Sequence, residues 1–217
     1  MRLTRRRVLY GGAALAGLTA AGSALATAAR AALVATPRQT EGPFYPRKMP
    51  LDSDADLVNV AGRDAPATGT VTHVFGRVLT EDGRAMSGVT VEIWQCDAFG
   101  HYHYTGSLPR GGDPGFQGYG RSVTKADASY RFRTIRPVPY TWRTPHIHFA
   151  VSGPGMHRLT TQMYVAGEPK NESDGILKRV RDPARRAALI VPLEASELEE
   201  GALAGRFDIV LGRNLLI

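Results

Sequence analysis

The sequence has a single cysteine, Cys96, in 217 residues, so an intramolecular disulfide is excluded and packing or a bound metal must stabilise the fold. It also has little excess charge beyond its first residues. Four of its 27 basic residues lie in the first seven positions, and without them the net charge falls from +7 to +3. This small net charge gives little support for nucleic-acid binding. Long helices are not expected either, because the 24 glycines and 14 prolines favour many turns.

The amino-terminal residues contain an apolar run that is typical of a targeting segment. Thr4-Arg5-Arg6-Arg7-Val8-Leu9 leads into a stretch rich in alanine and glycine, and Ala24-Leu25-Ala26 has the small residues of a cleavage site. We therefore expect residues 1–26 to be a twin-arginine signal peptide, which implies the twin-arginine export machinery as a partner and a periplasmic or extracellular location. The run is too rich in glycine and alanine to favour a retained membrane anchor, so no stable membrane insertion is expected after cleavage.

The chain changes character twice after this leader. Residues 27–69 are polar and proline-rich and have neither a helical nor a strand period, which predicts a long irregular N-terminal arm that packs on the core. From residue 70 to 217, short β-branched and aromatic runs alternate with turn residues, which predicts an all-β domain, an antiparallel β-sandwich. A short helix is expected within residues 182–188. The expected strands cover residues 71–79, 90–96, 130–135, 146–152, 159–165, 188–192 and 206–211.

Two pairs of histidines have the spacing H-x-H, and each is a candidate for metal binding. His146 and His148 lie in an apolar run that favours a strand, where alternate side chains share a face. His101 and His103 would add two imidazoles and complete a nitrogen-rich site for zinc, copper or ferrous iron. Tyr102 is the other choice from that segment, and in a strand it faces the opposite way. Residue types and spacing leave both choices open.

Seven separated motifs, in one order from about Pro37 to Leu211, resemble those of a known enzyme family. They are Gln39-Thr40-Glu41-Gly42-Pro43-Phe44-Tyr45, Val91-Glu92-Ile93-Trp94-Gln95-Cys96-Asp97, Gly100-His101-Tyr102, Phe132-Arg133-Thr134-Ile135, Pro139-Tyr140, Pro145-His146-Ile147-His148-Phe149 and Thr161-Gln162-Met163-Tyr164. The chain resembles the intradiol ring-cleavage dioxygenases, and among them the protocatechuate 3,4-dioxygenase type with its single-chain, exported relatives.

The resemblance implies a non-haem Fe(III) site. Tyr102, Tyr140, His146 and His148 match the four metal ligands of the family, and Tyr140 matches the ligand that leaves when the substrate binds. Two phenolates and two imidazoles are a hard, electron-rich donor set that favours ferric over ferrous iron. Arg143 matches a residue that stabilises negative charge on the substrate. The resemblance therefore implies that Tyr140 and Arg143 are the catalytic residues.

The resemblance also implies a substrate pocket. Gly42, Pro43 and Tyr45 match a stretch that lines the pocket of the family, and Trp142 and Gln162 match a pocket tryptophan and glutamine. Two departures from the family pattern bear on the shape of this pocket. Arg-Thr-Pro precedes the first histidine where Arg-Pro is common, and the segment between the second tyrosine and that histidine is shorter than in the two-subunit protocatechuate enzymes.

The implied activity is cleavage of a catecholic 1,2-diol between its two hydroxylated carbons, with both atoms of O2 entering a muconate-type dicarboxylate. Two other functions are open: a non-catalytic, secreted β-sandwich binding module, and a zinc or ferrous metalloenzyme built on the histidine pairs. The sequence does not select among catechol, protocatechuate, hydroxyquinol and other diols. It does not fix the oligomeric state either, although homo-oligomers occur in the family that it resembles.

Overall fold

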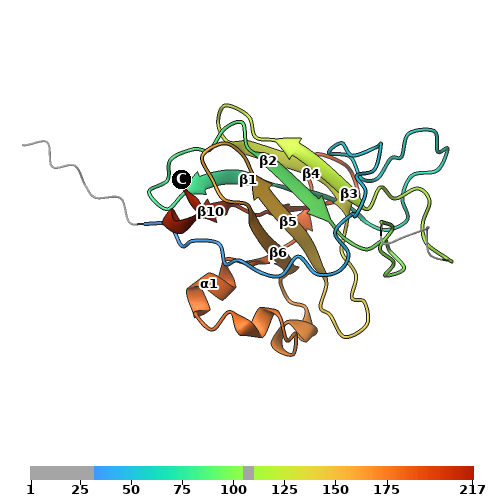
Figure 1. Ribbon diagram of the computed structural model, residues 1–217. Coiled ribbons are helices and arrows are strands. Elements are labelled where there is room, and N and C mark those ends of the chain that lie inside the picture. Colours follow the sequence, from blue (N-terminus) through green and yellow to red (C-terminus); the bar gives the residue numbers. More distant parts are fainter. Residues whose placement is uncertain (1–31, 105–109) are drawn as a thin grey trace, which may run out of the picture. The chain divides into compact units, whose positions relative to one another are not determined.

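Two β-sheets packed face to face form the body of the protein, as the computed structural model shows for residues 32–104 and 110–217 (Figure 1). The predicted signal peptide, residues 1–26, lies outside the described residues. Val74 and Phe132 from the first sheet meet Ile93 and Phe149 from the second in one buried core. Each strand directs every second side chain to this core, so apolar residues at alternate positions hold the two sheets together.

The first sheet is built around β1 (Val71–Thr80). β4 (Ser129–Ile135) pairs antiparallel with one edge of β1, β9 (Leu203–Arg206) and β10 (Ile209–Leu211) run parallel to it, and β8 (Glu194–Ala195) pairs antiparallel with β9. The backbone between β9 and β10 passes very close to β1. A Cβ at Gly76 would come within 2.0 Å of the Phe207 carbonyl oxygen, so this crossing requires glycine.

The second sheet has the strand order β3-β2-β5-β6-β7. Its strands are β2 (Thr90–Trp94), β3 (Tyr119–Val123), β5 (His146–Ser152), β6 (Leu159–Val165) and β7 (Ile190–Val191). The pairs β3-β2, β2-β5 and β5-β6 are antiparallel, whereas β7 runs parallel to β6. β5 therefore lies at the centre, with a neighbour on each side that can support the groups it presents.

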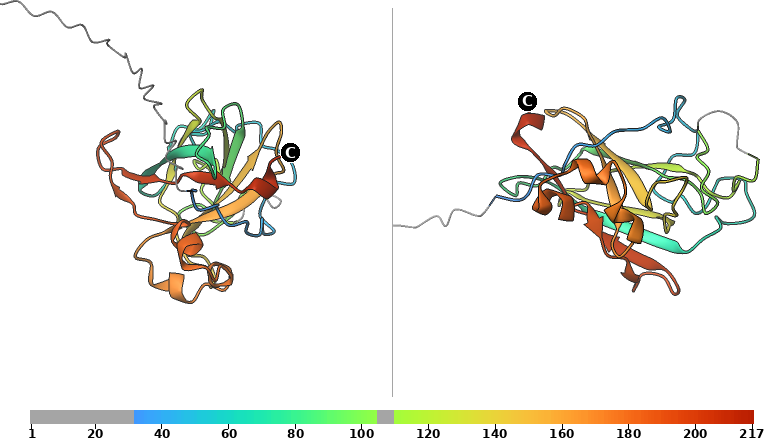
Figure 2. Two further views of the ribbon diagram at one scale, coloured as in Figure 1. Left: turned by 90° about the vertical axis from the view of Figure 1, so that its left-hand side faces the viewer. Right: turned by 90° about the horizontal axis from the view of Figure 1, so that it is seen from below.

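Short helical segments connect β6 to β7 and lie below β6 in Figure 1; Figure 2 shows the same segments, in orange, from two further sides. They are η1 (Pro169–Glu172), η2 (Leu177–Arg179) and α1 (Pro183–Ala187), and η3 (Arg213–Leu215) follows β10. Asp182 caps α1, because its side chain accepts a 2.9 Å hydrogen bond from the Arg185 amide and a proline follows it. In the described part of the chain no helix is long and apolar enough to span a membrane.

The all-β prediction is confirmed. The two sheets are mixed, and not wholly antiparallel as predicted, because three of their strand pairs are parallel. The strands predicted at 146–152 and 159–165 have the predicted bounds, and the expected short helix is α1. The strands β3, β8 and β9 were not predicted. Two of them contain a glycine that weakens the strand pattern, yet a Cβ at Gly120 would lie 2.5 Å from the Asp54 carbonyl oxygen, so close packing requires glycine in β3.

Alternation along β5 decides what each face of the second sheet carries. Ile147, Phe149 and Val151 point into the core between the sheets, so His146 and His148 point to the outer face. All of these side chains are buried. The outer face of β5 must therefore be covered by another part of the chain.

The N-terminal arm covers that face. From residue 32 to 69 it forms no helix or extended strand, and backbone hydrogen bonds attach it to both sheets: Thr36 N donates to Val210 O at 2.9 Å, and Gln39 N to Thr160 O at 2.8 Å. In Figure 1 it passes, in blue, in front of β5 and β6. A Cβ built at Gly42 would lie 3.6 Å from the Cε1 atom of His148, which shows how closely the arm approaches the histidines.

Candidate metal centre

Four aromatic side chains meet on the outer face of the second sheet, beneath the arm. The ring centroids of Tyr102 and Tyr140 are 5.3 Å apart, and those of Tyr140 and His146 are 5.6 Å apart. The two histidine rings are 4.9 Å apart, and His148 lies 6.2 Å from Tyr102, which closes the set. The four come from the loop after β2, the turn before β5 and β5 itself, so only the folded chain brings them together.

β5 presents both histidines with free ring nitrogens. The Nδ1 atom of His146 donates a 2.6 Å hydrogen bond to the Thr144 carbonyl oxygen, which leaves the lone pair on Nε2. This Nε2 is buried and has no hydrogen-bond partner among the described residues, and neither nitrogen of His148 has one. The ring of Trp94 stacks on that of His148 at 4.8 Å and fixes its plane. Both imidazoles are thus oriented, and both offer a nitrogen.

Tyr102 is held from the loop that follows β2. Its side chain is buried, and the Phe44 ring of the arm lies parallel to it, with the centroids 4.3 Å apart. Within the described part of the chain its hydroxyl oxygen has no hydrogen-bond partner. A buried hydroxyl without a partner costs about 1–3 kcal/mol. A metal ion bound to this oxygen would remove that cost.

Tyr140 begins a tight turn that folds its ring back toward the histidines. The Arg143 amide donates a 2.9 Å hydrogen bond to the Tyr140 carbonyl oxygen, and Thr141 between them has a φ of 47°. This left-handed conformation is strained for a β-branched residue, and such strain is concentrated at functional sites. The turn is the physical reason why a tyrosine six residues before His146 can contact it.

Burial keeps these four groups neutral while no cation is bound. It lowers the pKa of His146 to about 4 and that of His148 well below the usual value, and the positive charge of Arg143 acts in the same direction. Burial raises the pKa of Tyr102 and of Tyr140, and Arg143 opposes this. Neutral imidazoles are the form that binds metal ions, and the two phenols need a strong cation at their oxygens to ionise at neutral pH.

The donor set fits a ferric ion. Within residues 32–104 and 110–217, no group of three His, Cys, Asp or Glu side chains is placed to bind a metal, so a metal held by the two histidines needs the tyrosines as further ligands. Three of the four side chains have buried donor atoms without a protein partner: Tyr102, His146 and His148. Phenolate oxygens and imidazole nitrogens together favour a hard, trivalent metal.

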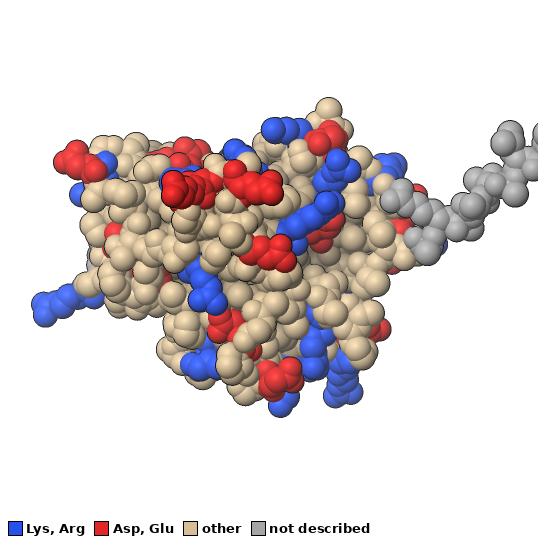
Figure 3. All heavy atoms as spheres, turned by 180° about the vertical axis from the view of Figure 1, so that it is seen from behind, with Lys and Arg blue, Asp and Glu red and all other residues tan. Residues whose placement is uncertain are grey.

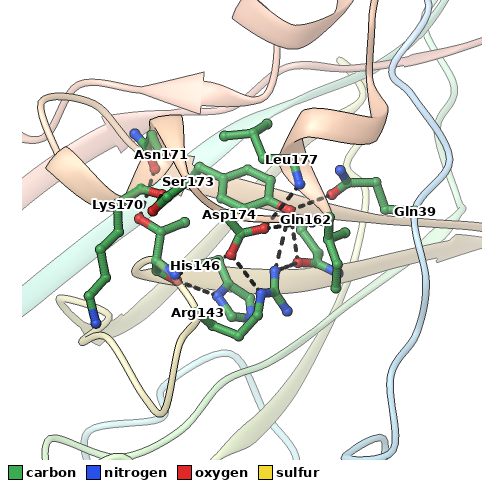
Figure 4. A network of polar contacts seen from close by, with 12 residues as sticks. Gln39, Arg143, His146, Gln162, Lys170, Asn171, Ser173, Asp174 and Leu177 are labelled. Atoms are coloured by element: carbon green, nitrogen blue, oxygen red, sulfur yellow. Dashed lines mark hydrogen bonds and ion pairs between the residues drawn. The ribbon is translucent and has the colours of Figure 1, made fainter.

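A buried arginine, Arg143, lies beside His146 (Figure 4). Arg143 donates from Nε to Asp174 Oδ2 at 2.7 Å and from Nη2 to Gln162 Oε1 at 2.6 Å. Burial by itself would lower the pKa of Arg143, but the hydrogen bond and charge of Asp174 outweigh it and raise the pKa. Gln162 is fixed in turn, because its Nε2 donates to the Thr40 carbonyl oxygen at 3.0 Å. The guanidinium is therefore a permanent cation in a fixed position.

A cavity of about 380 Å³ opens beside the rings and this arginine. Its volume lies in the range of small-molecule sites, roughly 300–1,000 Å³. The lining comes from the arm, the turn before β5 and the segment after β6: Thr40, Gly42, Pro43, Phe44, Tyr140, Thr141, Trp142, Arg143, His148 and Ile176. The cavity thus joins two of the four candidate ligands to the fixed cation.

Comparisons with known proteins agree with this geometry. The family model described as "Dioxygenase" matches residues 40–213, and the chain is 39% identical over 168 residues to the protocatechuate 3,4-dioxygenase beta chain of Burkholderia cepacia, covering 73% of this chain and 71% of that one. The chain belongs to the intradiol ring-cleavage dioxygenase family. It is also 32% identical over 180 residues to catechol 1,2-dioxygenase 2 of Acinetobacter lwoffii, covering 70% of this chain and 62% of that one.

A solved structure supports the same family. The dioxygenase domain of a dioxygenase carbohydrate-binding protein fusion from Streptomyces sp. SirexAA-E has a TM-score of 0.65 and 33% identity to this intradiol dioxygenase. The match covers 82% of this chain and 99% of that one. The similarity therefore extends over nearly the whole of that domain.

The structure separates the five pocket residues predicted for this intradiol dioxygenase into two groups. Those that line the cavity are Gly42, Pro43 and Trp142. Tyr45 is not among the lining residues, because its hydroxyl donates a 2.8 Å hydrogen bond to Glu92 and its ring packs edge-on against Trp94. Gln162 is fully buried behind the lining and contacts the cavity only through two lining residues, Arg143 and Thr40.

Three residues that lie near the site were not predicted as site residues. Phe44 lies in a quoted motif, but nothing in its position shows that it stacks on Tyr102. Asp174, which is fully buried against Arg143, and Ile176, which lines the cavity, lie in a segment without motif or period. For these two residues the sequence offered no signal, because their contacts with the site depend on how the helical connection folds back.

The four-histidine alternative is not formed. The Nε2 atom of His103 lies 2.9 Å from Asp97 Oδ2, and the Nδ1 atom of His101 lies 3.7 Å from Asp97 Oδ1. These residues lie in a loop and not in a strand, so the alternation that set Tyr102 against its neighbours does not apply. The fold places Tyr102 with the rings and directs both neighbouring histidines to a carboxylate.

A larger hollow, about 520 Å³, lies over the first sheet, but none of the described residues that line it has a buried side-chain nitrogen or oxygen atom without a hydrogen-bond partner. Two of its lining arginines are close to carboxylates: Arg206 donates to Asp208 at 3.0 Å, and Arg77 lies 3.9 Å from Asp127. On the face turned away from the viewer of Figure 1, Lys and Arg are interspersed with Asp and Glu (Figure 3). We therefore place the chemistry at the four rings.

Proposed function

We propose that this protein cleaves a catecholic 1,2-diol between the two hydroxylated carbons, using O2 and Fe(III), to give a muconate-type dicarboxylate. The observation that carries the proposal is the meeting of Tyr102, Tyr140, His146 and His148 beside a cavity that holds a fixed cation; in the described part of the chain, three of the four have buried donor atoms without a hydrogen-bond partner. The named relatives act on protocatechuate and catechol, which supports a diol as the substrate class.

The four side chains would hold the metal through two oxygens and two nitrogens. When bound, a ferric ion would supply a Lewis acid that lowers the pKa of both diol hydroxyls and draws electron density from the ring. Tyr102 is buried under Phe44, whereas Tyr140 lines the cavity. Tyr140 is therefore the phenol that can exchange with the substrate and take up a proton from it at Oη.

Arg143 performs the electrostatic part of the reaction. Its guanidinium is held by Asp174 and Gln162, so it needs no reorganisation when negative charge develops on the substrate. The arm contributes by excluding water, since Phe44 and Gly42 cover Tyr102 and His148. The chain thus provides binding, a proton acceptor and a preorganised cation.

Oxygen consumption across a panel of catechol, protocatechuate and hydroxyquinol tests the proposal, with the ring-opened product identified by mass. We expect iron-dependent uptake of one O2 per diol and a red to brown protein, because tyrosinate bound to ferric iron absorbs visible light. An iron-loaded protein without colour would contradict the two-tyrosine site. A coloured protein that consumes no O2 with any diol would favour the binding-module alternative.

We also propose export through the twin-arginine route, on the basis of the Arg5-Arg6-Arg7 motif and the apolar run up to Ala26. Replacement of Arg5 and Arg6 together by lysine should leave the protein in the cytoplasm. Cell fractionation with an antibody measures this. An unchanged distribution in the double-lysine variant would contradict the proposal.

A further inference from the structure

A second cavity adjoins the one beside the rings. It measures about 370 Å³ and is lined by Arg38, Gln39, Thr40, Ile176, Arg179 and Val180. Thr40 and Ile176 line both cavities. The two hollows therefore share a wall between the arm and the segment after β6, next to the place where the proposed substrate binds.

The lining of this second cavity is cationic and contains no carboxylate. The Arg179 side chain has no hydrogen bond or ion pair with any residue that the structure describes, and Arg38 uses only its Nη2 atom, which donates to the Arg158 carbonyl oxygen at 2.7 Å. The carboxylate of Glu41, beside Thr40 in the arm, is paired with Arg158. Both guanidinium groups of the lining thus keep N–H donors for an external anion.

Gln39 adds a buried donor with no partner. Its side chain is 9% exposed, and its Oε1 atom accepts a 2.9 Å hydrogen bond from the Tyr164 hydroxyl. The Nε2 atom has no hydrogen-bond partner among residues 32–104 and 110–217. Leaving a buried amide donor unpaired costs about 1–3 kcal/mol, so a ligand that accepts from it is favoured. The Gln39 amide thus adds a further hydrogen-bond donor to those of the two arginines.

The surrounding chain favours anions as well. Residues 178–186 contain five cations and one acid, and this stretch includes Arg179 and leads away from the cavity. Such a cluster raises the local concentration of anionic ligands. Ile176 and Val180 contribute apolar side chains to the same lining. The cavity combines an apolar wall with donors for one negative group.

We propose that this second cavity is an anion subsite, and that the enzyme acts on catecholic diols that carry a carboxylate at the end of a short apolar side chain. The diol lies at the four rings, the side chain passes Thr40 and Ile176, and the carboxylate accepts hydrogen bonds from Arg38, Arg179 and Gln39. The position of the diol rests on the proposed function. The subsite itself rests on the lining of the second cavity.

Steady-state oxygen uptake with catechol, 3-(3,4-dihydroxyphenyl)propanoate and the methyl ester of this acid tests the subsite. We expect the acid to have the lowest KM, and Arg179→Gln or Arg38→Gln to raise the KM for the acid about tenfold, which is the order of one charge-assisted hydrogen bond. The KM for catechol should not change. Arg181→Gln is the matched control, because it removes a nearby cation that does not line the cavity.

Binding measured without turnover separates this proposal from the proposed function. Trp142 lines the first cavity, so its fluorescence reports ligands in anaerobic protein. The acid should bind about tenfold more weakly to Arg179→Gln than to Arg181→Gln, by the same hydrogen-bond argument. Equal affinity for acid and ester, or no change in either cavity variant, would overturn the subsite. Tight, arginine-dependent binding of the acid without oxygen uptake would uphold the subsite and reject the dioxygenase activity.

Discussion

The chain contains two H-x-H pairs with identical spacing, and the structure gives them opposite surroundings. His146 and His148 lie on β5, under the arm, and the ion pair of Arg143 with Asp174 is nearby. His101 and His103 lie in a loop and face the buried carboxylate of Asp97. The rings of His146 and His148 lie close to those of Tyr102 and Tyr140, whereas both histidines of the other pair lie beside a carboxylate. The same motif is therefore a metal-binding candidate in one place and the neighbour of a buried carboxylate in the other.

The two regions also use their hydrogen bonds differently. Asp97 accepts from the amides of Phe99 and His101 at 2.9 Å and from the amide of Asp113 at 2.8 Å, in addition to His103. Burial raises the pKa of this carboxyl, but these hydrogen bonds, with that of His103 first, outweigh it and lower the pKa to about 2. The carboxylate organises the loop that carries Tyr102. The second pair thus supports the site without belonging to it.

The largest difference between the pairs should appear on alanine substitution. His148→Ala, and likewise Tyr102→Phe, should lose iron and visible colour, because each removes a donor atom that has no replacement. His101→Ala and His103→Ala are the matched controls and should keep both. Iron analysis and the visible spectrum measure this. Loss of iron from both control variants would show that His101 and His103 are metal ligands.

Low pH should destabilise the metal-free protein, because the buried histidines of β5, His146 and His148, resist protonation in the folded state. The pKa of His146 is about 6.5 in the unfolded chain and about 4 in the fold. Between these two pH values the unfolded chain binds more protons than the folded one. The free energy of unfolding therefore falls as the pH drops from about 6.5 to about 4. The loss should be roughly 3 kcal/mol for this one group. Urea unfolding of apoprotein at several pH values measures it. His146→Gln should flatten the profile, and an unchanged slope in that variant would disprove the assignment.

Replacement of the cation beside the β5 pair should impair catalysis while the metal stays bound. Arg143→Gln should lower kcat about 100-fold, the magnitude found when one preorganised charge stabiliser is removed. Iron content should be unchanged, because Arg143 supplies none of the four candidate donor atoms and its guanidinium is held by Asp174 and Gln162. Arg136→Gln removes an exposed arginine paired with Glu168 and serves as the control. Equal effects of the two changes would deny Arg143 a special role.

The smallest expected effect concerns the carboxylate beside the loop pair. Asp97→Asn should lower the free energy of unfolding by about 2 kcal/mol, since the amide cannot satisfy every donor that faces the buried carboxylate. His103→Ala should cost less, because the three backbone amides keep their acceptor. Chemical denaturation compares them. If His103→Ala is the more damaging change, the loop depends on the imidazole and not on the carboxylate.

Much of the fold could be read from the sequence. Short apolar and β-branched runs bounded by turn residues predicted β5 and β6, and the period-two geometry of a strand placed His146 and His148 on one face. β9 was missed because a short strand with a glycine has little pattern and because its partner β1 lies far away in sequence, and β8 was missed because it has only two residues. Tyr45 and Gln162 were assigned to the pocket from the family pattern, but Glu92 and Arg143 hold them outside the cavity lining.

The sequence alone determined the fold class, the shared face of the β5 histidines and, through ordered motifs, the family. The tertiary structure decided which H-x-H pair lies with the two tyrosines, because the loop after β2 places the other pair beside the carboxylate of Asp97. It also decided that Tyr102 and Tyr140 meet, through a loop and a strained turn that have no period. Local spacing records which side chains share a face, whereas the contact between the loop that carries Tyr102 and the histidines of β5 joins segments that are distant in sequence.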